Sequence, residues 1–166
     1  MSVFEDIKDA TQGKPKSKDW YRGQLFGALD PGEVKVGDCI YYSYSAATES
    51  LPFFDTFPMT LVVDIDPING QFSGGNLHYL RPTARQSIAK TWGSGSISYP
   101  MRCHHKYFIG RASNIRLVPP VDLRDFVPLP SEQFVRELGG VRIEIPSSVI
   151  WSRLSVSYTH LRAHET

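Results

Sequence analysis

From Pro31 onward the chain places apolar and polar residues in short runs that are separated by turn residues. Val34 and Val36 alternate ahead of a turn at Gly37 and Asp38, and a run rich in tyrosine, "CIYYSY", follows. Similar runs are "MTLVVDID", "QFSGGNLHYL", "SISYP", "HHKYFIG" and "ASNIRLVPP". β-branched and aromatic residues bounded by turn signals are typical of strands. The pattern therefore predicts a β-rich fold.

One hairpin is predicted between the strands "MTLVVDID" and "QFSGGNLHYL". Asn69 and Gly70 lie between them, and this dipeptide is the strongest short-range signal for a tight turn. Ahead of the first strand, "LPFFDTFP" puts Pro58 at a strand start, where a missing N–H is tolerated. Asp55 is placed to accept backbone N–H bonds in an Asx turn. Its replacement by alanine is expected to cost about 1 kcal/mol.

The first 30 residues have a helical pattern instead. Phe4 and Ile7 are spaced for one face of a helix, and a second helix is predicted to begin near Ser17 and to carry Trp20. Between them, "GKPKSKDWYR" combines lysines with aromatic residues, and its net charge of +3 is the strongest local charge in the chain. We expect residues 1–30 to form a helical arm with a basic hinge.

Two further helices are predicted within the β-rich part. "RPTARQSIAKTW" forms one after Pro82, with Ile88 and Trp92 as its apolar positions. "PSEQFVRELGG" has the form of a capped helix, with Ser131 as N-cap and Gly139 beyond its end. The fold class predicted from these elements is β-rich α+β. We expect a small mixed β-barrel or half-barrel over residues 31–154, with the helical arm and peripheral short helices around it.

Length and charge narrow the possible functions. The 166 residues are enough for one domain with a hydrophobic core. With 18 Lys and Arg against 17 Asp and Glu, the net charge is +1, so no overall field attracts nucleic acid or anionic lipid. No apolar run approaches the roughly 20 residues that cross a bilayer, so no membrane partner is expected. Cys39 and Cys103 are expected to be free thiols in a reducing compartment.

No set of residues indicates catalysis or metal binding. Cys-x2-Cys and His-x3-His spacings are absent, and adjacent histidines on a strand point to opposite faces. Asp64 and Asp66 share a strand face but lack a third partner for a divalent ion. Neither a G-x-S-x-G turn nor a phosphate-binding loop occurs. We expect no catalytic residue, metal or cofactor, although potential ligands exist at Cys39, His78, Cys103, His104 and His105.

Two kinds of contact remain open. The basic hinge either binds nucleic acid through phosphate contacts and base stacking, or is a solvated segment whose aromatic residues pack on the barrel. The candidate nucleic-acid contacts are Lys14, Lys16, Lys18, Arg22, Arg81 and Arg85. The candidate protein contacts are Phe4, Ile7, Trp20, Phe53 and Phe54.

The chain also contains a characteristic series of segments, which are "SVFEDIKDATQGKPKSKDWYRGQLFGAL", "IYYSYSAATESLPFFDTFPMTLVVDI", "GGNLHYL", "SISYPM" and "VPLPSEQF". In this order and spacing they resemble a family of small proteins of T4-like tailed bacteriophages, particularly marine ones. The resemblance covers about Ser2 to Leu154, with Phe53 and Phe54 where family members have tyrosines. The resemblance depends on all of these segments together, and no single segment is specific by itself.

The resemblance implies a non-enzymatic structural or assembly protein of the virion. Such a protein would contact other virion proteins, in the host cytoplasm during assembly and in the particle. The alternative is an accessory protein that binds DNA, for example to protect DNA ends or to assist packaging. The sequence does not fix the oligomeric state.

The last eleven residues, "VSYTHLRAHET", form a separate segment. Val156–Thr166 resembles the translated read-through of a sequencing adapter. We therefore expect residues 155–166 to be a non-native tail and the natural sequence to be known to about Leu154.

Overall fold

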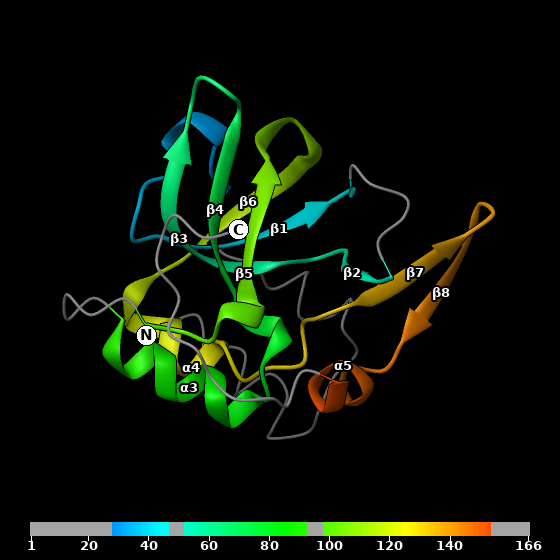
Figure 1. The fold of residues 1–166 in the computed structure, drawn as a ribbon. Helices are drawn as coiled ribbons and strands as arrows, with labels where there is room; N and C mark the ends of the chain where they lie inside the picture. The colour runs from blue at the N-terminus through cyan, green and yellow to red at the C-terminus, as the bar shows by residue number, and fades with distance from the viewer. Residues whose placement is uncertain (1–27, 47–51, 93–97, 154–166) are drawn as a thin grey trace.

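The computed structural model describes residues 28–46, 52–92 and 98–153. These residues form two antiparallel sheets and three α-helices (Figure 1). The predicted β-rich α+β class is confirmed. The predicted barrel is not, because the strands within the described ranges form two separate sheets and close no barrel. Most of the predicted helical arm and the adapter-like tail lie outside the described residues.

The larger sheet has the strand order β5-β4-β3-β1-β6, and every neighbouring pair is antiparallel. Five of the predicted runs form these strands. The run "QFSGGNLHYL" does so only in part, because β4 ends at Asn76 and Leu77–Tyr79 form a 3-10 helix. A strand was also predicted over "SISYP". Its described residues, 98–100, lie outside the named strands. The strands of the larger sheet are β1 (Cys39–Tyr44), β3 (Met59–Asp66), β4 (Gln71–Asn76), β5 (His104–Phe108) and β6 (Ala112–Val118).

The turns around β3 follow the sequence closely. Asp55 Oδ1 accepts a hydrogen bond from Phe57 N at 3.0 Å, which confirms the Asx turn. Pro58 directly precedes β3, as predicted. The β3–β4 hairpin is also confirmed, with Gly70 at φ 63°. Its loop spans four residues, 67–70, because Asp66 and Gln71 form the last pair of the ladder.

The smaller sheet has the order β2-β7-β8, with strands β2 (Phe54–Asp55), β7 (Phe134–Leu138) and β8 (Val141–Ile145). The β7–β8 hairpin extends away from the rest of the molecule (Figure 1). The prediction of a helix over "PSEQFVRELGG" is wrong, since this segment contains β7 and ends in the turn that follows it. Gly139 and Gly140, at φ 56° and 81°, form a two-residue turn that pairs β7 with β8. Ser131 caps no helix here.

The helices lie below the larger sheet in the view of Figure 1. The helix predicted after Pro82 is confirmed as α3 (Pro82–Thr91), which packs beside α4 (Pro120–Phe126). Neither α4 nor α5 (Ser147–Arg153) was predicted, because each has only seven residues. Short 3-10 helices join the strands at Pro31–Glu33, Leu77–Tyr79, Met101–Cys103 and Ile109–Arg111.

Both faces of the larger sheet are buried. Tyr41 and Met59 belong to a hydrophobic cluster with Phe126 of α4. Ile40 and Tyr42, one residue to either side of Tyr41, belong to a different cluster, because successive side chains of a strand point to opposite faces. In the part of the chain that the structure describes, no helix has the length and apolar character that crossing a membrane requires.

Candidate functional site

Three buried polar side chains from distant segments form a chain of hydrogen bonds. Asp55 comes from the turn before β3, His78 from the 3-10 helix Leu77–Tyr79, and Ser131 from the loop before β7. His78 Nδ1 lies 2.7 Å from Asp55 Oδ2, and His78 Nε2 lies 2.9 Å from Ser131 Oγ. Carboxylate, imidazole and hydroxyl thus follow one another in the order of a Ser-His-Asp triad.

Asn76 holds the first two members of this chain in place. Its Oδ1 caps the 3-10 helix by accepting from His78 N at 3.0 Å, and also accepts from Met59 N at 3.3 Å. Its Nδ2 donates to Asp55 Oδ2 at 3.2 Å. We call Asp55, Asn76, His78 and Ser131 together the polar clamp. It connects the start of β3, the end of β4 and the entry to β7.

The electrostatics of the clamp favour an ionised Asp55. Burial by itself raises the pKa of this carboxyl, but the charge and hydrogen bond of His78, with the bonds from Phe57 N and Asn76, hold the pKa below its ordinary value. With Asp55 ionised, His78 donates Nδ1–H to it. In neutral His78, Nε2 then accepts the hydroxyl proton of Ser131.

The clamp has the atoms of an acyl-transfer site but not its accessibility. His78 and Ser131 have no exposed surface, and Asp55 is 3% exposed. A nucleophilic serine has to meet its substrate at hydrogen-bond range of the base. The Ser131 carbonyl is also bonded, accepting from the Tyr41 hydroxyl at 2.8 Å. As it stands, the arrangement ties three segments together. Sequence reasoning missed it because no local motif links residues so far apart.

A buried ion pair lies next to the clamp. Arg85 of α3 contacts Glu132 through Nη2 and Oε1 at 2.5 Å, and both side chains are at most 4% exposed. The guanidinium also donates to the carbonyls of Leu80 at 2.8 Å and Val127 at 3.2 Å. Arg85 therefore has no surface with which to contact a phosphate. Its assignment to nucleic acid is corrected: it anchors α3 to the loop before β7.

The other candidate contacts do not come together in one site. Arg81 is exposed and lies 6.0 Å from the Trp151 ring. Phe53 is half-buried and packs near Tyr79 and Phe134, and Phe54 is half-buried in β2. The remaining candidates lie outside the described residues, namely Lys14, Lys16, Lys18, Arg22, Phe4, Ile7 and Trp20.

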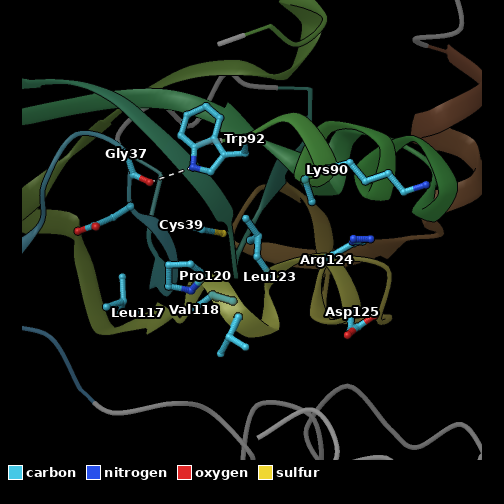
Figure 2. Close-up of a pocket in the computed structure, with 13 residues that line it drawn as sticks. Gly37, Cys39, Lys90, Trp92, Leu117, Val118, Pro120, Leu123, Arg124 and Asp125 are labelled. Atoms are coloured by element: carbon cyan, nitrogen blue, oxygen red, sulfur yellow. Dashed lines mark hydrogen bonds between the residues drawn. The ribbon is translucent and has the colours of Figure 1, made fainter. Parts of the chain in front are cut away.

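A groove of about 910 Å³ lies between the end of α3, the start of β1 and α4 (Figure 2). Trp92 borders it and donates from Nε1 to the Gly37 carbonyl at 2.9 Å. Its lining combines buried apolar side chains such as Val118 and Leu123 with charges of both signs, including Lys90 and Asp125. Cys39 also lines the groove, and burial raises the pKa of its thiol. Within the described ranges, no three His, Cys, Asp or Glu side chains are grouped for a metal ion.

The β7–β8 hairpin carries an exposed apolar face. Val141 and Ile143 of β8 are 60% and 49% exposed. Phe134 pairs with Ile145, and Arg136 with Ile143, so Val141, Ile143 and Ile145 share the face of Phe134, which is fully buried. The face that forms core at the base of the hairpin therefore continues outward to its tip.

β8 is also the edge of its sheet. In the part of the chain that the structure describes, its only strand neighbour is β7. The opposite side of β8 presents backbone N–H and C=O groups that can pair with another strand. We call this edge, together with Val141 and Ile143, the hairpin surface.

Comparisons with known proteins do not indicate a function, so function has to be inferred from the geometry of the described residues. No protein-family model, curated protein or solved structure matches the chain. Within the described ranges, the features that bear on function are the buried polar clamp, the groove beside Trp92 and the hairpin surface.

Proposed function

We propose that this protein is a non-enzymatic structural or assembly protein that acts by protein–protein contact through the hairpin surface. One observation carries the proposal: the apolar face of β8 passes from the core to the tip of a projecting hairpin. An unpaired, apolar edge strand favours association with another chain. Covering the exposed parts of Val141 and Ile143 would contribute about 1 kcal/mol each.

The burial of the polar clamp supports contact over catalysis. Ser131 and His78 have the hydrogen bonds of a nucleophile and its base, yet both are fully buried. Asp55 is bonded to His78 and accepts a hydrogen bond from Gln133 N, so the turn before β3 is tied to the 3-10 helix after β4 and to the loop before β7. These bonds hold the base of the hairpin in place. The clamp then acts as the support of the hairpin surface.

The biological setting of the proposal comes from the sequence resemblance. A chain that resembles small proteins of T4-like phages would meet its partners, other virion proteins, in the host cytoplasm during assembly and in the finished particle. A projecting apolar hairpin suits such a component, because it offers a small contact to a neighbouring subunit.

Purified phage particles test the proposal. We expect mass spectrometry to detect the wild-type protein in particles or assembly intermediates. We expect the double variant Val141→Thr, Ile143→Thr to be depleted from them, since threonine removes apolar surface but keeps the branched side chain that strands favour.

The matched control is Val121→Thr. Val121 is 77% exposed but lies on α4, away from the hairpin. This variant should be incorporated like the wild type. Absence of the wild-type protein from both particles and intermediates would contradict the proposal, as would normal incorporation of the hairpin variant.

A further inference from the structure

We propose that β8 pairs antiparallel with β8 of a second copy of this chain, about a two-fold axis at Ile143. The two smaller sheets would then form one sheet of six strands, in the order β2-β7-β8-β8-β7-β2. This inference rests on the proposed function, because it names the partner of the hairpin surface. It is argued from the backbone, the charges and the apolar face of β8.

The turn of the hairpin determines which backbone groups of β8 face outward. Gly139 and Gly140 both have positive φ, the geometry of a two-residue type I′ turn. The pair that closes such a turn, Leu138 with Val141, exchanges backbone hydrogen bonds. Because bonded and non-bonded pairs alternate along an antiparallel ladder, Ile143 and Ile145 also direct their N–H and C=O toward β7. Arg142 and Glu144 therefore direct theirs to the open edge.

The charges of these two outward-facing residues select one register. Two copies of β8 can meet with Arg142 opposite Arg142, with Glu144 opposite Glu144, or with Arg142 opposite Glu144. The first two registers place like charges directly opposite each other, which is destabilising. The third places opposite charges together twice, because the two-fold axis repeats the pair. It also forms four backbone hydrogen bonds, two for each Arg142–Glu144 pair.

The arginine is already positioned for this contact. Arg142 Nη2 lies 2.9 Å and Nε 3.3 Å from Glu137 Oε1, across the hairpin on the face opposite Ile143. Its side chain remains 54% exposed. A guanidinium has five N–H donors, so it can hold Glu137 and accept Glu144 of the second copy together. The dimer would thus contain a row of carboxylate, guanidinium and carboxylate.

The same register brings the apolar faces of the two copies side by side. Val141 would lie opposite Ile145 of the second copy, and Ile143 opposite Ile143. The exposed apolar side chains of the two hairpins would then form a single apolar stripe across both copies. With five residues from each copy, the contact is much smaller than a standard interface, which has roughly 20–30 residues on each side. We therefore expect weak self-association, with a dissociation constant on the order of tens of micromolar.

Sedimentation equilibrium of the full chain, from about 1 to about 300 µM, tests the proposal around this dissociation constant. We expect the mass to rise from monomer to dimer over this range. Arg142→Glu and Glu144→Arg should each weaken self-association about tenfold or more, because each puts like charges opposite each other twice. An equimolar mixture of these two variants should recover the dimer, since each then faces its opposite charge. A monomer at every concentration would overturn the proposal, as would charge variants that dimerise like the wild type.

Amide hydrogen exchange supplies an internal control. At high protein concentration the amides of Arg142 and Glu144 should gain protection, because they face the second copy. The amides of Ile143 and Ile145 are bonded to β7 in either state and should exchange at rates that depend less on concentration. A dimer that forms without protection at Arg142 and Glu144 would overturn the proposed pairing.

The two experiments together distinguish a wrong dimer proposal from a wrong proposed function. If the chain stays monomeric but the Val141→Thr, Ile143→Thr variant is still depleted from particles, the hairpin surface binds another virion protein. The dimer is then refuted and the contact function stands. If the chain dimerises as described but the variant is incorporated normally, the dimer stands and the proposed function is refuted.

Discussion

Asp55 is the residue on which the polar clamp depends. Its Oδ1 accepts from Phe57 N at 3.0 Å and Gln133 N at 3.2 Å, and its Oδ2 accepts from Asn76 Nδ2 and His78 Nδ1. Removing the carboxylate would leave several buried donors unsatisfied, one of them on a histidine that can carry a charge. The cost of such a loss is set by the groups left behind as well as by the bonds broken.

We therefore expect Asp55→Ala to lower the free energy of unfolding by about 3–5 kcal/mol, the range for breaking one side of a buried pair. Urea unfolding at neutral pH measures this. Asp64→Ala, which removes an exposed carboxylate from β3, is the control and should stay within about 0.5 kcal/mol of the wild type. A loss near 1 kcal/mol for Asp55→Ala would mean that the turn bond alone matters.

The sequence predicted the nearest partner of Asp55 but not the others. An Asx turn depends on residues two apart, so the bond from Phe57 N could be predicted from "DTF" alone. Asn76, His78 and Gln133 come to Asp55 through strand pairing and the path of the loop before β7. No local pattern encodes that meeting, so the sequence alone led to the lower expected cost of about 1 kcal/mol.

At the scale of elements, β3 and β4 approach each other closely at Gly74. A Cβ atom at this position would lie 2.0 Å from the Leu61 carbonyl oxygen, so alanine cannot fit unless the strands separate. We expect Gly74→Ala to destabilise the protein by about 3 kcal/mol or to prevent folding, because the clash is with backbone. Urea unfolding followed by circular dichroism would measure it.

Gly110→Ala provides the matched control for Gly74→Ala. A Cβ atom at Gly110 meets nothing within 4 Å, so this variant should differ from the wild type by less than about 1 kcal/mol. Equal stability of the two variants would show that β3 and β4 can separate locally at little cost.

The sequence predicted the elements that have strong local patterns. It did not predict β7, which forms a strand because it pairs with β8. β1, β3 and α3 have apolar spacing that is sufficient by itself. The segment before Gly139 contains good helix formers such as Glu132 and Glu137, yet its end forms β7 because "VRIEI" pairs with it across the Gly139–Gly140 turn. With β7 mistaken for a helix, the hairpin surface could not be foreseen.

At the scale of the whole molecule, histidines and carboxylates make stability depend on pH in separate ranges. Burial lowers the pKa of His105 as well as that of His104, and hydrogen bonding lowers the pKa of Asp66 as well as that of Asp55. Burial, with the nearby charges of His105 and Lys106, lowers the pKa of His104 to about 4 from an ordinary 6.5. The fold thus favours neutral His104, and stability is lost as the pH falls from 6.5 toward 4. The pKa of Asp55 is held below an ordinary 3.8, so its contribution is present above that pH and is lost as the pH falls further.

We therefore expect the unfolding free energy to decline in two stages between pH 7 and pH 2, because the histidines and the carboxylates titrate in different ranges. His104→Gln should reduce the slope of the first stage, and Asp55→Asn the slope of the second, in urea unfolding curves measured across this range. Wild-type stability that is the same at pH 7 and pH 4.5 would contradict the part assigned to His104.

The polar clamp also bears on the order in which the chain folds. His78 lies 23 residues after Asp55, whereas Ser131 lies 53 residues after His78, and Gln133 lies 78 residues after Asp55. Closing such long loops has an entropic cost, so contacts of this separation form slowly. During synthesis the strands of the larger sheet leave the ribosome before Ser131 does. The clamp that holds the base of the hairpin can therefore close only after Ser131 and Gln133 have been synthesised, and self-association through the hairpin would have to wait until each chain is nearly complete.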